Sequence, residues 1–384
     1  MKTLLATALT LISVSASFAQ QPPKLPPPFD VPSVNNSPTV IPRPAGAQVK
    51  VPAGFTVEEY ASGFQRPRVM VEGPGGEIIV SETIANGSVV ALKGGTKTVL
   101  LSGLDRPYGL ALWKEYLYVG EPASIKRYKY DSKALTVGKG EEVVSLAGYV
   151  KGHVTRTILF DEKAGKMYVT VGSSADLVVG DPADRAAINV YNPDGSGHEV
   201  YATGLRNTVG LRFYPGTKQL WGTVEERDGP VPDFFTSIQK GGFYGWPYAW
   251  VGPNVDPRIA EKDRKPEMVA KAIKPDVPLE PHVAVLDLLF YTGRQFPAEY
   301  RNGAFLANHG SQSLPQRIGY SVSFVPFKNG KPAGPPRDFA TGWMLGPDKK
   351  EVWGRPVAML QLKDGSLLIS DDGGKVIWRV SYKK

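Results

Sequence analysis

The chain has 384 residues, contains no cysteine, and carries 45 Lys and Arg against 37 Asp and Glu, a net charge of +8. The lack of cysteine excludes disulfides, thiolate zinc sites and a covalently attached haem. The basic residues are scattered rather than clustered, and such a surface does not favour nucleic-acid binding.

The first 19 residues are typical of a secretory signal peptide. Lys2 supplies a positive start, an apolar stretch follows, and Ser17-Phe18-Ala19 is a small-x-small cleavage site. The apolar stretch is shorter than the roughly 20 residues that span a bilayer. We therefore expect cleavage near Ala19, a periplasmic or secreted protein, and no membrane anchor.

Residues 20–50 are rich in proline and show no periodic apolar face. Proline favours extended backbone without internal hydrogen bonds, so this segment is predicted to be a tether or a strap on the surface. Strand signals begin directly after it. One folded domain is therefore predicted over residues 51–384.

A recurring unit dominates the rest of the chain: a polar residue, a short apolar strand, a turn, and a second strand. Six such units open at Arg68, Tyr108, His153, Asn207, His282 and Arg355. They are about 40 to 75 residues apart, and periods near 40 to 50 residues with several strands per unit indicate a propeller. The two longer steps require insertions. We predict an all-β protein, a six-bladed β-propeller.

The two ends of this domain fit the closure of a ring of blades. Phe55–Tyr60 alternates apolar and polar residues as a half-buried strand does. Val376–Tyr382 follows the sixth pair of strands without a partner in sequence. Pairing the N-terminal strand with the last blade would remove both free edges. The best helical candidate, Pro257–Lys274, lies in the insertion between the fourth and fifth units.

The repeat also predicts where polar side chains gather. The second strand of each unit returns antiparallel to the first, so the start of one and the end of the other lie on the same face. Polar residues can occupy loop edges for structural reasons alone, but histidines and arginines at most openings favour a functional mouth of the channel. The residues expected there are Arg68, Tyr108, His153, Arg206, Asn207, Asp228, His282, His309, Ser311 and Arg355.

These residue types suit a particular chemistry. A histidine can take a proton from a hydroxyl near neutral pH, and arginines bind carboxylates through paired hydrogen bonds. Carbonyl and carboxylate oxygens around the turn Glu226–Pro230 can bind Ca²⁺. A base, an anion cradle and a hard-metal site favour the oxidation of an alcohol with an anionic cofactor, although composition alone does not specify which one.

Four motifs in fixed order narrow the choice: GLRN, GGFYGWP, HGS and GRPV. Together they make the chain resemble the glucose/sorbosone dehydrogenase family, whose members are soluble six-bladed sugar dehydrogenases that use pyrroloquinoline quinone (PQQ). The likeness runs from about Gly63 to Tyr382 and is closest to the L-sorbosone-dehydrogenase-like branch.

The resemblance implies roles for residues at the mouth. His153 matches the general base, and Arg206 matches the arginine at the reactive carbonyl of the quinone. Asp228 and Gly229 fall where backbone carbonyls bind Ca²⁺. The residues expected to bind the cofactor are Asn207, Arg355, His309, Ser311, Tyr108 and Arg68.

The function that this implies is PQQ-dependent oxidation of an aldose or aldehyde, of the sorbosone or glucose type. Hydride would pass to the quinone, and an external acceptor would take the electrons because the chain has no haem motif. Two alternatives stay open. One is a non-catalytic propeller that binds a sugar or another ligand. The other is a Ca²⁺-dependent lactonase or hydrolase, which needs several carboxylates at one metal, whereas this mouth is rich in arginine.

Overall fold

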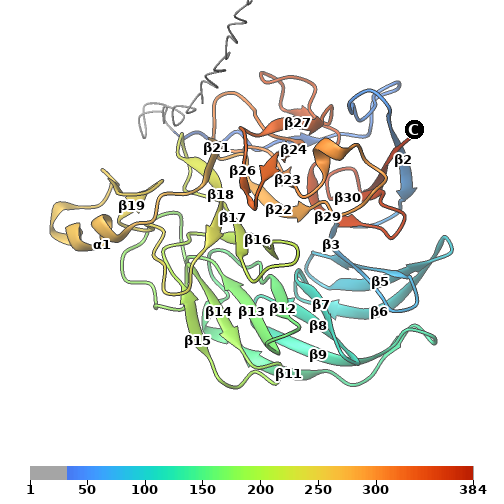
Figure 1. The fold of residues 1–384 in the computed structure, drawn as a ribbon, viewed down its shortest axis with the longest axis horizontal. Coiled ribbons are helices and arrows are strands. Elements are labelled where there is room, and N and C mark those ends of the chain that lie inside the picture. Colours follow the sequence, from blue (N-terminus) through green and yellow to red (C-terminus); the bar gives the residue numbers. More distant parts are fainter. Residues whose placement is uncertain (1–32, 384) are drawn as a thin grey trace, which may run out of the picture.

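The computed structural model describes residues 33–383. Six small β-sheets surround a central axis, as Figure 1 shows in a view close to that axis. The predicted six-bladed β-propeller is therefore confirmed. Each blade begins with its innermost strand, and these strands are β3 (Pro67–Glu72), β7 (Leu110–Trp113), β12 (Ile158–Asp161), β16 (Thr208–Phe213), β22 (Val285–Phe290) and β29 (Pro356–Gln361).

The remaining strands of each blade pair antiparallel outward from the axis. The first two blades add β4 (Ile78–Glu82), β5 (Gly87–Lys93) and β6 (Thr96–Leu104), then β8 (Tyr116–Glu121), β9 (Ser124–Asp131), β10 (Thr136–Val137) and β11 (Glu141–Ser145). The third and fourth add β13 (Lys166–Val171), β14 (Ala187–Tyr191) and β15 (Glu199–Ala202), then β17 (Leu220–Val224), β18 (Pro232–Ile238) and β21 (Val277–Pro281). The fifth adds β23 (Ala304–Asn308), β24 (Ser321–Val325) and β27 (Arg337–Ala340), and the sixth adds β30 (Leu367–Asp371) and β31 (Val376–Tyr382).

The sixth blade is completed by β2 (Phe55–Ala61), the first long strand of the described chain. Its register places Phe55 opposite Tyr382 and Val57 opposite Val380. The predicted closure is thus confirmed. Phe55 is only 9% exposed, and its ring meets four aromatic rings edge-on at centroid distances of 4.8 to 5.4 Å, those of Phe296, Tyr300, Phe339 and Tyr382.

An arm projects from the fourth blade, at the left of Figure 1. It contains β19 (Ala249–Trp250), β20 (Asn254–Val255), a 3₁₀ turn (Glu261–Asp263) and the helix α1 (Pro266–Lys271). The predicted helix over Pro257–Lys274 is therefore only partly right, because a turn and extended chain occupy its first half. Within the described residues no helix is long and apolar enough to cross a bilayer.

Smaller elements decorate the rim. Residues 33–50 lie across the fifth and sixth blades, where β1 (Thr39–Val40) pairs parallel with β28 (Glu351–Val352). The fifth blade also carries the hairpin of β25 (Phe327–Lys328) and β26 (Lys331–Pro332), and two 3₁₀ turns cover Ala147–Tyr149 and Ala298–Tyr300. The predicted signal peptide, residues 1–19, lies outside the described residues.

Ring closure by β2 supports a testable expectation. Phe55→Ala removes a buried aromatic side chain from the seam, and a substitution of this kind costs about 3–5 kcal/mol of unfolding free energy. Thr56→Ala, on the exposed face of the same strand, should change stability by less than about 0.5 kcal/mol. Denaturant unfolding of both variants measures this, and equal losses would show that the aromatic seam does not hold the ring.

Candidate functional site

The polar residues that precede the innermost strands and follow the second strands form two groups at one mouth of the channel. The first group is His153, Asp176, Arg206, Asn207, Glu225, Asp228 and His282. The second group is Arg66, Arg68, His309, Arg355 and Asp372. The structure thus brings most of the predicted site residues into two hydrogen-bonded networks.

His153 is held in one tautomer. Its Nδ1 lies 3.0 Å from the carbonyl oxygen of Ser173 and 3.0 Å from the Ser173 hydroxyl. That hydroxyl donates to the carbonyl of Ala175, so Nδ1 faces two acceptors and carries the proton. The lone pair of Nε2 is therefore available. Burial, reinforced by the positive charge of Arg206, lowers the pKa of His153 to about 4, which keeps the ring neutral at physiological pH.

Close approach at this point depends on Gly172, which follows β13. A Cβ at residue 172 would lie 2.6 Å from the His153 Cβ and 2.6 Å from the Asn207 Oδ1. Any side chain larger than hydrogen would therefore push the two residues apart. The glycine allows the third and fourth blades to bring His153 and Asn207 together.

Arg206 is fixed by four hydrogen bonds. Its Nε donates to the carbonyl of Asp176 at 3.0 Å, and Nη2 donates to the Asp176 carboxylate at 3.0 Å. Nη1 donates to the carbonyls of Glu225 and Glu226 at 3.2 and 2.8 Å. Four of its five N–H groups are thus used within the protein. The positive charge is held in place, and one Nη2 hydrogen remains.

Asn207 and Glu225 form the wall beside this arginine. The Asn207 Nδ2 donates to Glu225 Oε2 at 2.8 Å, while its buried Oδ1 accepts no hydrogen bond from the described residues. Burial alone would raise the pKa of Glu225, but the charges of His282 and Arg206 outweigh it and lower that pKa to about 2. The Glu225 carboxylate is therefore ionised.

His282 lies between two carboxylates and a carbonyl. Its Nε2 is 3.2 Å from Asp228 Oδ1 and 3.8 Å from Glu225 Oε1, and its Nδ1 is 3.1 Å from the carbonyl oxygen of Glu226. The Asp228 side chain is 45% exposed, so it faces the open mouth. Asp228 also donates its backbone N–H to Asp176 at 2.7 Å.

Asp372 organises the second group. It accepts hydrogen bonds from Arg68 at 2.7 and 2.9 Å, from Arg66 at 3.0 Å and from His309 Nε2 at 2.9 Å. Burial would raise the pKa of Asp372, but His309 and the arginines hold it well below its ordinary value. Burial and the charge of Arg355 lower the pKa of His309 to about 3. We assign the neutral ring, since Arg66 and Arg68 already balance the carboxylate.

Arg355 and Ser311 shape the loop after β23. Arg355 donates from Nε to the carbonyl of His309 and from Nη2 to that of Gly310, both at 3.2 Å, and lies 5.5 Å from the Tyr320 ring centroid. The buried Ser311 hydroxyl accepts the N–H of Ile318 at 3.0 Å. This hydrogen bond therefore stabilises the loop after β23.

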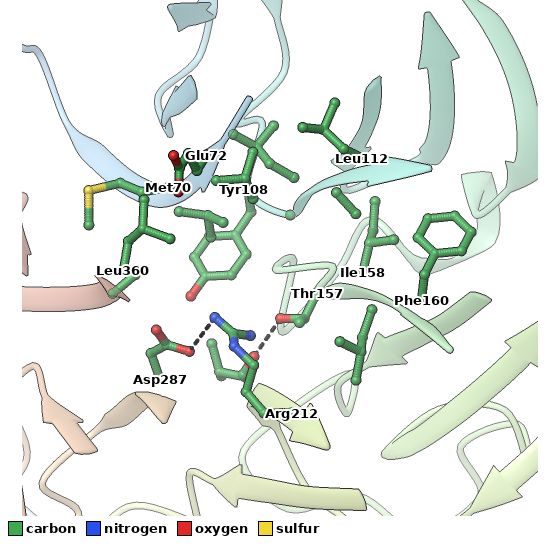
Figure 2. Close-up of a pocket in the computed structure, with 18 of the residues that line it drawn as sticks. Met70, Glu72, Tyr108, Leu112, Thr157, Ile158, Phe160, Arg212, Asp287 and Leu360 are labelled. Atoms are coloured by element: carbon green, nitrogen blue, oxygen red, sulfur yellow. Dashed lines mark hydrogen bonds and ion pairs between the residues drawn. The ribbon is translucent and has the colours of Figure 1, made fainter. Parts of the chain in front are cut away.

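Tyr108 is placed differently from the other predicted site residues. The Arg68 guanidinium lies 5.9 Å from its ring centroid. The Tyr108 hydroxyl points the other way, toward Arg212 and Asp287, into the pocket drawn in Figure 2. The structure does not bring the Tyr108 hydroxyl into either group at the mouth.

Sequence reasoning missed several residues that fix the site. The Asp176 carboxylate accepts hydrogen bonds from Arg206, from the backbone N–H of Asp228 and, at 3.2 Å, from Arg258. It lies in a long loop between β13 and β14, where no periodic pattern marks it. Arg258 comes from the arm, so the arm belongs to the same network.

The arm is anchored by a fully buried arginine. Arg227 forms ion pairs with Glu226 and Asp256, both at 3.0 Å, and all three side chains are inaccessible to solvent. Its Nη2 also donates to the carbonyl of Pro247 at 3.2 Å. The turn that carries Asp228 is therefore tied directly to the base of the arm.

The sequence matches the TrAA12-like family over residues 49–233 and 254–383. The chain belongs to the TrAA12-like family. An uncharacterized protein of Borreliella burgdorferi is 28% identical over 360 residues, 88% of this chain and 91% of that protein. The aldose sugar dehydrogenase YliI of Escherichia coli is 30% identical over 118 residues, which are 30% of this chain and 31% of that enzyme.

Solved structures of similar fold cover nearly all of this TrAA12-like chain. A Trichoderma reesei enzyme of carbohydrate-active enzyme family AA12 superposes with a TM-score of 0.76 at 20% identity, covering 90% of this chain and 99% of that one. The PQQ domain of pyranose dehydrogenase from Coprinopsis cinerea superposes with a TM-score of 0.72 at 20% identity, covering 88% and 98%. At this identity the likeness establishes the fold.

The anchoring role of Arg227 in this TrAA12-like protein can be measured. Arg227→Met leaves two buried carboxylates without their cation, and breaking a buried pair in this way costs about 3–5 kcal/mol. Lys262→Met, an exposed lysine-to-methionine change on the same arm, should cost less than about 0.5 kcal/mol. Denaturant unfolding compares the two. A loss below about 1 kcal/mol for Arg227→Met would contradict the anchoring role.

Proposed function

We propose that this TrAA12-like protein oxidises an aldose or aldehyde with PQQ as cofactor. In this proposal it acts in the periplasm or outside the cell and passes its electrons to an external acceptor. The observation that carries the proposal is a neutral His153, with Nε2 free, beside the fixed charge of Arg206 at a mouth that contains further arginines. The pyranose dehydrogenase PQQ domain and the aldose sugar dehydrogenase among its relatives point to the same chemistry.

The residues at the mouth fit a polycarboxylate quinone. Arg68 and Arg355 each keep Nη1 without a hydrogen-bond partner among the described residues, and arginine binds carboxylates well. The buried Asn207 Oδ1 lacks a donor in the same part of the chain. In the proposal Arg68, Arg355 and Asn207 hold the cofactor, and His309 and Ser311 support the loop beside it.

The chain's own contribution is to move one proton and fix one charge. His153 Nε2 accepts the proton of the substrate hydroxyl. The imidazole can act as a base only while its ring is neutral. Ser173 keeps Nδ1 protonated and the ring oriented. Arg206 supplies a preorganised positive charge for negative charge that develops beside it. PQQ, when bound, supplies the electrophilic carbonyl that accepts the hydride.

Ca²⁺ is the second component of the proposed cofactor set. Among the described residues no three acidic or histidine side chains converge as a metal site. The carbonyl oxygens of Asp228 and Gly229 accept no hydrogen bond from the same residues, so backbone ligands for a hard cation are free. We propose Asp228 and Gly229 as the ligands and assign them no step in the reaction.

The first test is reconstitution of the mature protein with PQQ, with and without Ca²⁺, followed by dye reduction over a panel of aldoses and aldehydes. His153→Ala should retain PQQ binding and lose about 10²–10⁴-fold in kcat, the usual contribution of a general base. His198→Ala, an exposed histidine on the third blade that bonds Asn189, should keep wild-type activity.

Each outcome of that test is informative. PQQ binding without turnover on any substrate would favour the non-catalytic ligand-binding propeller. No PQQ binding with or without Ca²⁺ would reject the proposed cofactor. Turnover that survives in His153→Ala would reject the assignment of the base while leaving the cofactor in place.

The pH profile tests the state of His153 separately. Because the pKa of His153 lies near 4, the base is protonated only below that value, and kcat/KM should fall on the acid side near pH 4. With an unperturbed histidine, this acid limb of the pH profile, where kcat/KM falls, would lie near pH 6.5. Circular dichroism must show a folded protein at each pH. An acid limb near pH 6.5 in a folded enzyme would contradict the lowered pKa.

A further inference from the structure

The central channel has a second mouth, opposite the candidate site. The ends of the innermost strands surround a cavity of about 290 Å³ there, drawn in Figure 2. Its inner end is closed by a packed cluster of Tyr108, Val209, Leu286, Val357 and Ala358. The cavity is therefore separate from the two groups that contain His153 and Asp372.

The inner end of this cavity presents hydrogen-bond donors. Arg212 pairs with Asp287 at 3.2 Å and donates from Nη1 to the carbonyl of Leu211, which leaves three of its five N–H groups without a partner among the described residues. The Tyr108 side chain is only 2% exposed, and its hydroxyl makes no hydrogen bond to any described residue. Figure 2 shows that hydroxyl directed at the Arg212–Asp287 pair.

The buried carboxylate at this end is already occupied. Asp287 is 4% exposed and accepts the N–H of Met359 at 2.9 Å in addition to Arg212. A ligand at this end therefore meets N–H and O–H groups rather than a free carboxylate, so an ammonium group is unsuited. Glu72 and Glu162 lie in the lining, Glu72 paired with Lys363 at 2.9 Å, and these acidic groups disfavour an anion.

Apart from Thr157, whose hydroxyl donates to the carbonyl of Val209, the remaining side chains of the lining are apolar. Leu110, Leu112, Ile158, Phe160 and Leu360 form much of the wall and offer no hydrogen bonds to the many hydroxyls of a sugar. Pockets that combine apolar walls with a few converging polar groups are typical small-molecule sites. We propose that this second mouth binds a small neutral molecule with an apolar ring and a carbonyl oxygen, which accepts hydrogen bonds from Tyr108 and Arg212. A simple quinone has this chemistry.

The proposal is tested by measuring the binding of 2-methyl-1,4-naphthoquinone to the mature protein with calorimetry and ligand-observed NMR. The chain has no cysteine for this probe to alkylate. Saturable binding is expected. Naphthalene, which has the ring system without carbonyls, should bind at least about tenfold more weakly if the donors contribute as hydrogen bonds usually do. The anion 2-naphthoate should also bind more weakly than the quinone.

Three variants locate the site. Tyr108→Phe removes only a hydroxyl that has no partner in the protein and should weaken binding about 3–10-fold, the effect of one hydrogen bond. Leu112→Trp should fill the cavity and abolish binding, with circular dichroism confirming the fold. Tyr116→Phe changes a tyrosine on β8 outside this lining and should leave the affinity unchanged.

Several results of these measurements would contradict the proposed second site. Absence of saturable binding would overturn the proposal, as would binding that Tyr108→Phe and Leu112→Trp leave unchanged. Naphthalene or 2-naphthoate binding as tightly as the quinone would reject the assigned ligand chemistry. Displacement of the probe by PQQ would place it at the first mouth instead. These measurements need no sugar and no turnover, so they stand or fall independently of the proposed oxidation.

Discussion

The common direction of the six innermost strands is the constraint on which the rest of the structure depends. Each runs from one mouth of the channel to the other, so residues just before the strands converge at one end and residues late in the strands at the other. Closure by β2 against β31 keeps the ring from opening. One geometric rule thus creates two chemically different mouths from a single repeated unit.

At the first mouth, a half-buried and a buried carboxylate hold arginines in place. Asp176 binds Arg206 and Arg258, and Asp372 binds Arg66 and Arg68. A charge fixed in this way needs no rearrangement when a ligand or a transition state arrives, which is the main advantage of preorganised sites. Burial and the charge of Arg206 lower the pKa of His153, so this arginine helps to keep the ring neutral.

The blades and much of the candidate site could be predicted from the sequence, because the patterns that reveal them are local. Strand alternation and turn residues are visible in short windows, and the openings at His153, Asn207 and Arg355 led directly to three innermost strands. Asp176 was not predictable, because its partners lie 30, 52 and 82 residues away. Tyr108 shows a different limit: an opening was identified correctly, but the direction of the side chain depends on packing against residues of other blades, Val209, Leu286 and Val357 among them.

The cluster around Tyr108 explains how one channel can serve two mouths. Val209, Leu286, Val357 and Ala358 pack around its ring. His153 is not part of this cluster and does not line the cavity, and its pKa is lowered by its own burial and by the charge of Arg206. Apolar packing in the middle of the ring thus separates an arginine-rich mouth from a largely apolar cavity, although both are built from the same six strands.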